Sequence, residues 1–132
     1  MEKAGPEREK IRDYRDLSVW KDSMDLAVDI YTLTRAFPRD EMFAMTSQMR
    51  RASTSIPANI AEGFGRAQRK VFIQFLRVAQ GSLKELETHT VLSRRVGLLN
   101  EKQADDLGLR YEKLGKMLVS LVRSLERNGG ER

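Results

Sequence analysis

The stretch from Ser47 to Arg66, SQMRRASTSIPANIAEGFGR, constrains the fold of this chain more than any other. It belongs to an apolar pattern that repeats at alternating intervals of three and four residues. The positions that share this side are Met42, Met45, Met49, Ala52, Ile56, Asn59 and Gly63. A strand would repeat at every second residue, whereas intervals of three and four place side chains on one side of a helix. The pattern therefore predicts a helix with one buried side.

The ends of this helix carry residues that suit helix termini. Asp40 is expected to cap its start, because a carboxylate there accepts a bond from a free backbone N–H. Gly63 and Gly65 are expected to provide a left-handed end. Pro57 lies inside the helix, removes one backbone donor and frees the carbonyl of Ser53. We therefore expect a kink or a short break at Pro57.

Three further segments, at about residues 16–36, 67–96 and 100–127, carry apolar side chains at helical spacing. Phe37-Pro38 is expected to end the first segment, Gly97 to end the second, and Asn100 to cap the third. Helices of comparable length with short connections favour an antiparallel arrangement. The sequence thus predicts an all-α fold, an antiparallel up-down four-helix bundle.

The 132 residues are predicted to form one domain with an extension at each end. Residues 1–15 alternate in charge without an apolar period, so we expect a flexible N-terminal arm, followed by the bundle over 16–127. Residues 128–132 are expected to be a disordered tail. No apolar run approaches the roughly 20 residues of a membrane span. We expect a cytoplasmic protein without a membrane partner.

The net charge of +5 is concentrated in the middle of the chain. Arg39 to Arg95 holds ten Lys or Arg and five Asp or Glu, so the remainder is neutral. The first helical segment is acidic through Asp16, Asp22, Asp25 and Asp29. A basic middle suggests an anionic partner. An equally physical interpretation is that basic and acidic faces meet between copies of the same chain.

Basic residues of the second and third helices are predicted to form a nucleic-acid-binding surface. At 100° per residue, the third helix gathers cations on the side opposite its apolar side, where a row of cations can neutralise phosphates. The residues are Arg66, Arg69, Lys70, Arg77 and Lys84. The alternative is a solvated face that keeps the bundle soluble. Trp20, Tyr31, Phe72 and Phe75 are all expected on buried faces, so no aromatic platform for stacking bases is predicted.

A polar network is predicted where the second helix faces its neighbours. Its members are Arg50, Arg51, Asn59 and Glu62. Polar groups at such positions need hydrogen-bonding partners, and we expect them to fix the register between helices or subunits. A catalytic role is disfavoured, because no second residue completes an acid–base pair with Glu62.

The residue content excludes several kinds of chemistry. The chain has no cysteine, which rules out thiolate catalysis and cysteine-ligated zinc. The single histidine, His89, follows Glu85 by four residues, whereas a di-iron bundle needs two Glu-x-x-His motifs. The Ser53-Thr54-Ser55 cluster has no base nearby in sequence. We expect a protein that is not an enzyme and that holds no metal or other cofactor.

Four segments resemble the bacterial four-helix family that is encoded in intervening sequences of 23S rRNA genes. They are DLSVWKDSMDLAV, LTRAFP, TSQMRRASTSIPANIAEGFGR and FIQFLRVAQGSLKELET, and the resemblance covers roughly residues 14 to 125. The most specific part is SIPANIAEG combined with GSLKELET.

The resemblance implies a four-helix bundle that assembles as a homopentameric ring, which periodicity alone cannot show. It does not assign a biochemical activity. A similar architecture serves as the accessory protein of diversity-generating retroelements, where a basic pentamer works with a reverse transcriptase and nucleic acid. We therefore expect a homo-oligomer that binds RNA or DNA, or alternatively a scaffold for another protein whose basic residues serve subunit contacts.

Overall fold

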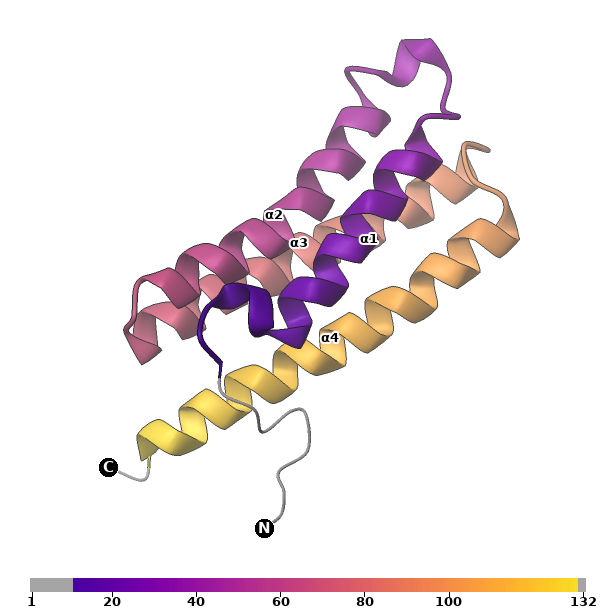
Figure 1. Cartoon of the computed structure of the whole chain (residues 1–132). Helices are drawn as coiled ribbons and strands as arrows, with labels where there is room; N and C mark the ends of the chain where they lie inside the picture. Colours follow the sequence, from indigo (N-terminus) through magenta and orange to yellow (C-terminus); the bar gives the residue numbers. More distant parts are fainter. Residues whose placement is uncertain (1–10, 131–132) are drawn as a thin grey trace.

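The computed structural model describes residues 11–130 and contains four α-helices. They are α1 (Ser18–Thr34), α2 (Met45–Gly65), α3 (Arg69–Arg95) and α4 (Glu101–Gly130). Two short 3-10 helices, η2 (Tyr14–Asp16) and η3 (Arg39–Glu41), precede α1 and α2. No strand occurs within residues 11–130, and successive helices run in opposite directions (Figure 1). The all-α fold with four helices is confirmed.

Each helix packs against the next one along the chain, and α4 also packs against α1. The four helices therefore form a closed cycle, in which α1 and α3 are diagonal to each other, as are α2 and α4. One core fills the space between them. Its fully buried members include Leu26, Ile30, Met49, Ile56, Ile60, Leu76, Leu83, Leu86, Leu114 and Leu118. Burying each such side chain contributes about 1.5–3 kcal/mol.

The start of α2 differs from the prediction. Asp40 lies in η3, and α2 begins only at Met45. The carboxylate of Glu41 accepts a hydrogen bond from the Met45 backbone N–H at 3.1 Å. Ala44 has a non-helical backbone (φ −124°, ψ −109°), which separates η3 from α2. The carboxylate that satisfies the first turn of α2 thus comes from Glu41, and Asp40 does not cap this helix.

Helix α2 continues without a break through Pro57. The hydroxyls of Ser53 and Thr54 both donate to the Arg50 carbonyl, at 3.0 and 2.9 Å. Pro57 is itself buried among the apolar residues of this helix. The short break that we considered at Pro57 is therefore absent.

In the turn from α2 to α3, the left-handed backbone conformation is adopted by Ala67, whereas it was predicted for Gly63 and Gly65. Ala67 has φ +60°, whereas Gly63 and Gly65 have no positive φ. Gly63 instead lies where α2 meets α3, because an added β-carbon would lie 2.5 Å from the Cβ of Phe75. The absent side chain of Gly63 allows close approach of two helices. At the end of α3, by contrast, Gly97 has φ +89°, as expected of a residue that ends a helix.

The beginning of α4 agrees with the prediction. Asn100 Oδ1 accepts from the Gln103 backbone N–H at 2.8 Å, and Gln103 Oε1 accepts from the Asn100 N–H at 2.9 Å. This reciprocal pair is a capping box. The other end extends further than predicted, because α4 continues past Asn128 to Gly130. Residues 131–132 of the predicted tail lie outside the described residues.

The boundary of the predicted N-terminal arm also differs. Residues 1–10 lie outside the described residues, but Tyr14 belongs to η2 and its ring packs edge-on against Trp20, with 5.2 Å between the ring centroids. The bundle therefore includes residues of the predicted arm. None of the helices described is both long enough and apolar enough to cross a lipid bilayer.

Candidate nucleic-acid interface

The predicted basic residues lie around the α2–α3 turn and along α3. Arg66 follows the last residue of α2, Arg69 and Lys70 begin α3, and Arg77 and Lys84 lie further along it. All are exposed except Arg69, which is half-buried. Arg66 thus lies in the turn between α2 and α3, outside both helices.

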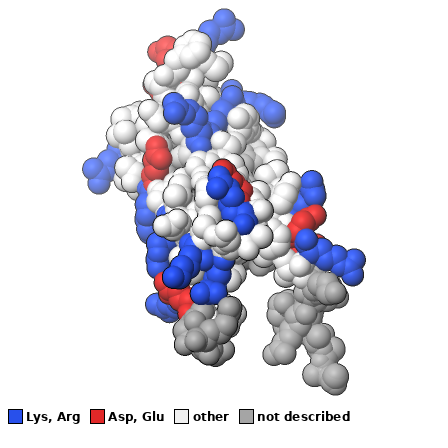
Figure 2. Space-filling model, turned by 90° about the vertical axis from the view of Figure 1, so that its left-hand side faces the viewer, with Lys and Arg blue, Asp and Glu red and all other residues white. Residues whose placement is uncertain are grey.

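Three of these five cations are paired with carboxylates of the same chain. Arg66 pairs with Glu62 at 2.9 Å, Arg77 with Glu126 at 2.8 Å and Lys84 with Glu87 at 3.3 Å. Figure 2 shows Lys and Arg side chains gathered most densely at the lower left of the face, with Asp and Glu side chains between some of them. Exposed ion pairs are worth only about 0–1 kcal/mol, so the cations stay available, but the carboxylates lower the local positive charge.

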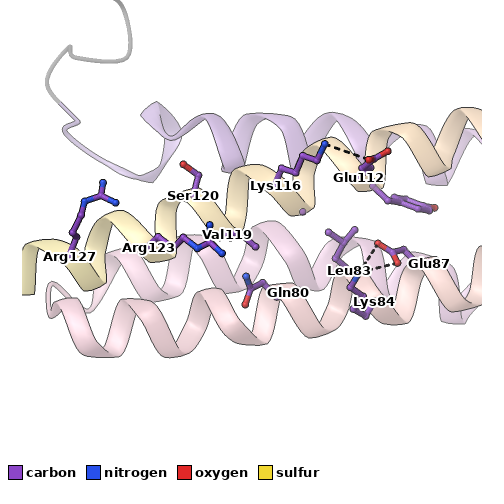
Figure 3. A pocket seen from close by; sticks show the side chains of 12 residues that line it. Gln80, Leu83, Lys84, Glu87, Glu112, Lys116, Val119, Ser120, Arg123 and Arg127 are labelled. Carbon is purple, nitrogen blue, oxygen red and sulfur yellow. Dashed lines mark hydrogen bonds and ion pairs between the residues drawn. The ribbon is translucent and has the colours of Figure 1, made fainter. Parts of the chain in front are cut away.

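A groove between α3 and α4 brings together cations that the sequence analysis did not combine. Its larger hollow, of about 830 Å³, is lined from α3 by Gln80, Leu83, Lys84 and Glu87, and from α4 by Tyr111, Glu112, Gly115, Lys116, Val119, Ser120, Arg123 and Arg127 (Figure 3). Four of these residues are cations and two are carboxylates. We call Lys84, Lys116, Arg123 and Arg127 the basic half of the α3–α4 groove.

Two arginines give this part of the groove its surplus positive charge. Lys84 pairs with Glu87, and Lys116 pairs with Glu112 at 3.5 Å. Within residues 11–128, no carboxylate oxygen lies within 4.0 Å of Arg123 or Arg127. These arginines are four residues apart, which places them about 6 Å apart along one side of α4. The site therefore offers two cations that need not be released from an acid first.

Sequence reasoning missed the contribution of α4. Lys116, Arg123 and Arg127 fell in the part of the chain whose charges cancel overall. Their intervals of seven and four residues could have indicated a shared side of one helix. What the sequence could not supply is which side of α4 meets which side of α3.

The predicted polar network is divided into separate contacts. Arg50 Nε donates to Thr34 Oγ1 at 3.0 Å, and its guanidinium lies 4.5 Å from the centroid of the Tyr31 ring, which ties α2 to α1. Arg51 is exposed on α2. Glu62 is also exposed and pairs with Arg66, so it does not face the core.

Asn59 supports the hydrogen bond by which Ser55 links α2 to α3. Its Nδ2 donates to the Ser55 carbonyl at 2.8 Å and to Ser55 Oγ at 3.0 Å. The Ser55 hydroxyl in turn bonds the Ser82 hydroxyl at 2.7 Å. The register between these two helices is thus fixed by small polar groups.

The acidic residues of the first helix are partly neutralised within the chain. Asp29 accepts a hydrogen bond from Arg110 of α4, and Asp22 pairs with Lys113 at 3.8 Å. Asp16 accepts backbone N–H bonds from Arg12 and Asp13, and these bonds lower the pKa of its carboxyl. The acidic surface that another copy could meet is therefore smaller than the sequence suggests.

One aromatic residue is more exposed than predicted. Tyr31 is 39% exposed, and Trp20 and Phe75 are half-buried, whereas Phe72 is buried as expected. The exposed ring of Tyr31 is on α1, away from the basic half of the α3–α4 groove, and no aromatic side chain of that groove is exposed for stacking.

The remaining buried polar groups belong to the core. The hydroxyls of Thr90 and Tyr111 are 2.7 Å apart, and burial raises the pKa of Tyr111 to about 12. His89 Nε2 is buried, lies 3.5 Å from Glu85 Oε2 and makes no hydrogen bond. Among residues 11–128, no group of three His, Cys, Asp or Glu side chains could hold a metal ion.

Known proteins resemble this chain in both sequence and fold. No curated protein matches it. A crystal structure of a protein of unknown function from the S23 ribosomal protein family of Bacteroides thetaiotaomicron is similar, with 28% identity and a TM-score of 0.74 over 80% of this chain and 95% of the other. The model of the 23S rRNA-intervening sequence protein family matches residues 15–120. The chain belongs to the 23S rRNA-intervening sequence protein family.

Proposed function

We propose that this protein is a non-catalytic, cytoplasmic homo-oligomer that binds the phosphate backbone of RNA or DNA through the basic half of the α3–α4 groove. The observation that carries the proposal is the position of Arg123 and Arg127. They share one side of α4, line the groove and have no carboxylate partner among the described residues. Lys70 and Arg77 of α3 extend the basic surface beyond the groove.

The chemistry of the groove favours contacts to the backbone. Cations that neutralise phosphates release condensed counterions, so affinity falls steeply as salt rises. The neutral side chains of Gln80 and Ser120 can donate to phosphate oxygens. Base-edge recognition would need side chains placed in a duplex groove, and stacking would need exposed aromatic rings. The groove therefore suits binding with little sequence preference.

A charge-reversal experiment tests this proposal. Arg123→Glu with Arg127→Glu is expected to weaken binding of a generic single-stranded RNA at least about tenfold and to flatten the slope of affinity against salt. Fluorescence anisotropy over a salt series measures both. Lys21→Glu with Lys102→Glu is the matched control, because it changes the net charge equally at exposed residues outside the groove. Equal losses in the two variants would count against the groove and in favour of a general charge effect.

The assembly part of the proposal is a homopentamer, and family membership supports it. The alternative, a scaffold for another protein with its cations used in subunit contacts, has less support, because Asp22 and Asp29 already pair with α4 of the same chain. Light scattering on the Arg123→Glu, Arg127→Glu variant separates the two. An intact oligomer that no longer binds RNA supports nucleic-acid binding, and dissociation supports the scaffold.

A further inference from the structure

One side of the molecule, between α1 and α2, is apolar and exposed. Met24, Val28 and Tyr31 lie at intervals of four and three residues on α1, and Val28 is 59% exposed. They border a hollow of about 630 Å³ between the two helices. A smaller hollow of about 270 Å³ shares Tyr31 with it and reaches Phe43 before α2. We call this continuous surface the α1–α2 face.

Phe43 is the most exposed apolar side chain of this face. It is 96% exposed, next to Met42, in the segment that connects η3 to α2. Hydrogen bonds on both sides of it, from the Met42 N–H to the Arg39 carbonyl and from the Met45 N–H to Glu41, hold this segment in place. A large aromatic ring that is held outside its own core contributes nothing to packing there. Such rings are typical anchors of protein interfaces.

The charges of the α1–α2 face have one sign. Its two hollows are lined by three arginines, Arg35, Arg50 and Arg51, and by no Asp or Glu among the described residues. A partner that fits this surface should therefore combine apolar groups with carboxylates.

The other half of the α3–α4 groove has this combination. A hollow of about 700 Å³ near the α3–α4 turn has Thr90, Val91, Ala104, Gly108 and Tyr111 as uncharged lining. Its four carboxylates are Glu87, Glu101, Asp105 and Glu112, against three cations, Lys84, Arg94 and Arg95. We call it the acidic half of the α3–α4 groove. Asp105 is exposed and has no cation within 4.0 Å among residues 11–128.

The topology places these two surfaces on opposite sides of the molecule. Because the helices form a closed cycle, the groove between α1 and α2 faces away from the groove between α3 and α4. The α1–α2 connection and the α3–α4 turn lie at the same end of the bundle (Figure 1). Two copies side by side with parallel axes would thus bring Phe43 and Arg51 of one beside the acidic half of the other.

We infer that the α1–α2 face of one copy docks head-to-tail onto the acidic half of the α3–α4 groove of a second copy. A contact between two different surfaces on opposite sides repeats from copy to copy, and it closes into a ring when the rotation allows. Lys116, Arg123 and Arg127 of the basic half lie further from the α3–α4 turn and stay open to RNA or DNA, whereas Lys84 lines both halves. This inference rests on the proposed homo-oligomer and names the surfaces that form it.

Two variants, each with one surface disabled, test the inference. The face variant carries Arg35→Glu and Arg51→Glu, since neither arginine makes an ion pair among the described residues, whereas Arg50 is needed by Thr34. The groove variant carries Asp105→Lys and Glu112→Lys, two exposed residues seven apart on α4. Each is expected to be a folded monomer by circular dichroism and sedimentation velocity. Mixed together, they are expected to associate again, because each keeps the surface that the other lacks and the two reversed surfaces are also complementary in charge.

Other outcomes overturn the inference in distinguishable ways. A monomeric wild-type protein would refute both the inference and the proposed homo-oligomer. A wild-type oligomer whose variants still assemble, or whose mixture stays monomeric, would refute the head-to-tail contact alone. Loss of wild-type assembly on nuclease treatment would show that nucleic acid bridges the copies. The Lys21→Glu, Lys102→Glu control must assemble like the wild type, or the effect belongs to net charge.

Phe43→Ser provides a second, uncharged test. Because the ring is almost entirely exposed in the single chain, its removal leaves the bundle core unchanged. The subunit dissociation constant is expected to rise at least about tenfold, as for an interface anchor. An unchanged dissociation constant would contradict the assignment of Phe43 to the contact.

Discussion

Gly63 of α2 lies so close to Phe75 of α3 that a β-carbon on Gly63 would be 2.5 Å from the Phe75 Cβ. The Phe72 ring would be 3.2 Å from the same added atom. The two helices therefore approach each other at a point where only glycine fits. Close packing of this kind leaves no flexible atom that could move aside cheaply.

Gly63→Ala is expected to destabilise the bundle by about 1–3 kcal/mol, because α2 and α3 would have to separate or Phe75 would have to leave its rotamer. Urea denaturation followed by circular dichroism measures the loss. Gly81→Ala in α3 is the control, since an added β-carbon there meets nothing within 4 Å. It should stabilise the protein by about 0.5–1 kcal/mol through helix propensity alone. Destabilisation of similar size in both variants would reject the packing explanation.

Asn100→Ala is expected to cost about 0.5–2 kcal/mol, because the first turn of α4 loses the acceptor for the Gln103 N–H. Asp40→Ala is the matched control. Asp40 was predicted from the sequence to cap a helix but does not cap α2, so its removal should change the free energy of unfolding by less than about 0.5 kcal/mol. A larger effect at Asp40 than at Asn100 would reverse this assignment of caps.

The stability of the fold should decrease at alkaline pH through Tyr111. Burial raises the pKa of Tyr111 to about 12, above its ordinary value of 10.0. Between these values the unfolded chain loses the phenolic proton while the folded chain keeps it, so the contribution to stability is complete below pH 10.0 and is lost as pH rises towards about 12. Tyr111→Phe should remove this pH dependence at a cost of about 0.5–1.5 kcal/mol at neutral pH. Tyrosinate absorbance and thermal unfolding against pH are the measurements, and an unchanged alkaline slope in the variant would disprove the role of Tyr111.

Glu126→Gln should strengthen RNA binding, because it frees Arg77 from its exposed ion pair and removes a charge that repels phosphate. An ion pair of at most about 1 kcal/mol limits the gain to about fivefold. Anisotropy at low salt measures the change. Glu62→Gln frees Arg66 in the same way at the α2–α3 turn. The gains in RNA affinity of the two variants therefore show whether the α3 surface or the turn contributes more to binding. Weaker binding by Glu126→Gln would contradict a phosphate-binding surface beside α3.

The apolar period predicted much of the core, because a helical period is a local property of the sequence. Met49, Ala52 and Ile56 are buried, as their spacing required, whereas Met42 of the same predicted side lies before α2 and is 46% exposed. The helix ends were harder to predict. Asp40 and Glu41 are adjacent acids, and only the shape of η3 decides which one reaches the first turn of α2. Ala67 adopts φ +60° although two glycines lie nearby, and Gly63 instead lies where the two helices meet.

The candidate site depends on contacts between helices, which one sequence does not reveal. Of the five predicted cations, all but Arg69 are exposed, but the partners Glu126 and Glu62 could not be assigned from spacing alone. Arg123 and Arg127 became visible only when α4 was placed against α3. Tyr31 was expected to be buried because its helix has a wide apolar side, yet α1 has neighbours on two sides only.

The pairs Asp29–Arg110 and Asp22–Lys113 join the first helix of the bundle to the last. The other helix–helix interfaces join helices that are consecutive in the sequence, so they can form early. The α1–α4 interface joins the first helix to the last, so it can form only after the helices between them have packed. Because these ion pairs join α1 to α4, we expect the packing of α4 against α1 to be the folding step whose rate depends most on ionic strength. Local opening of the native state should then begin between α1 and α4, leaving the α2–α3 pair intact.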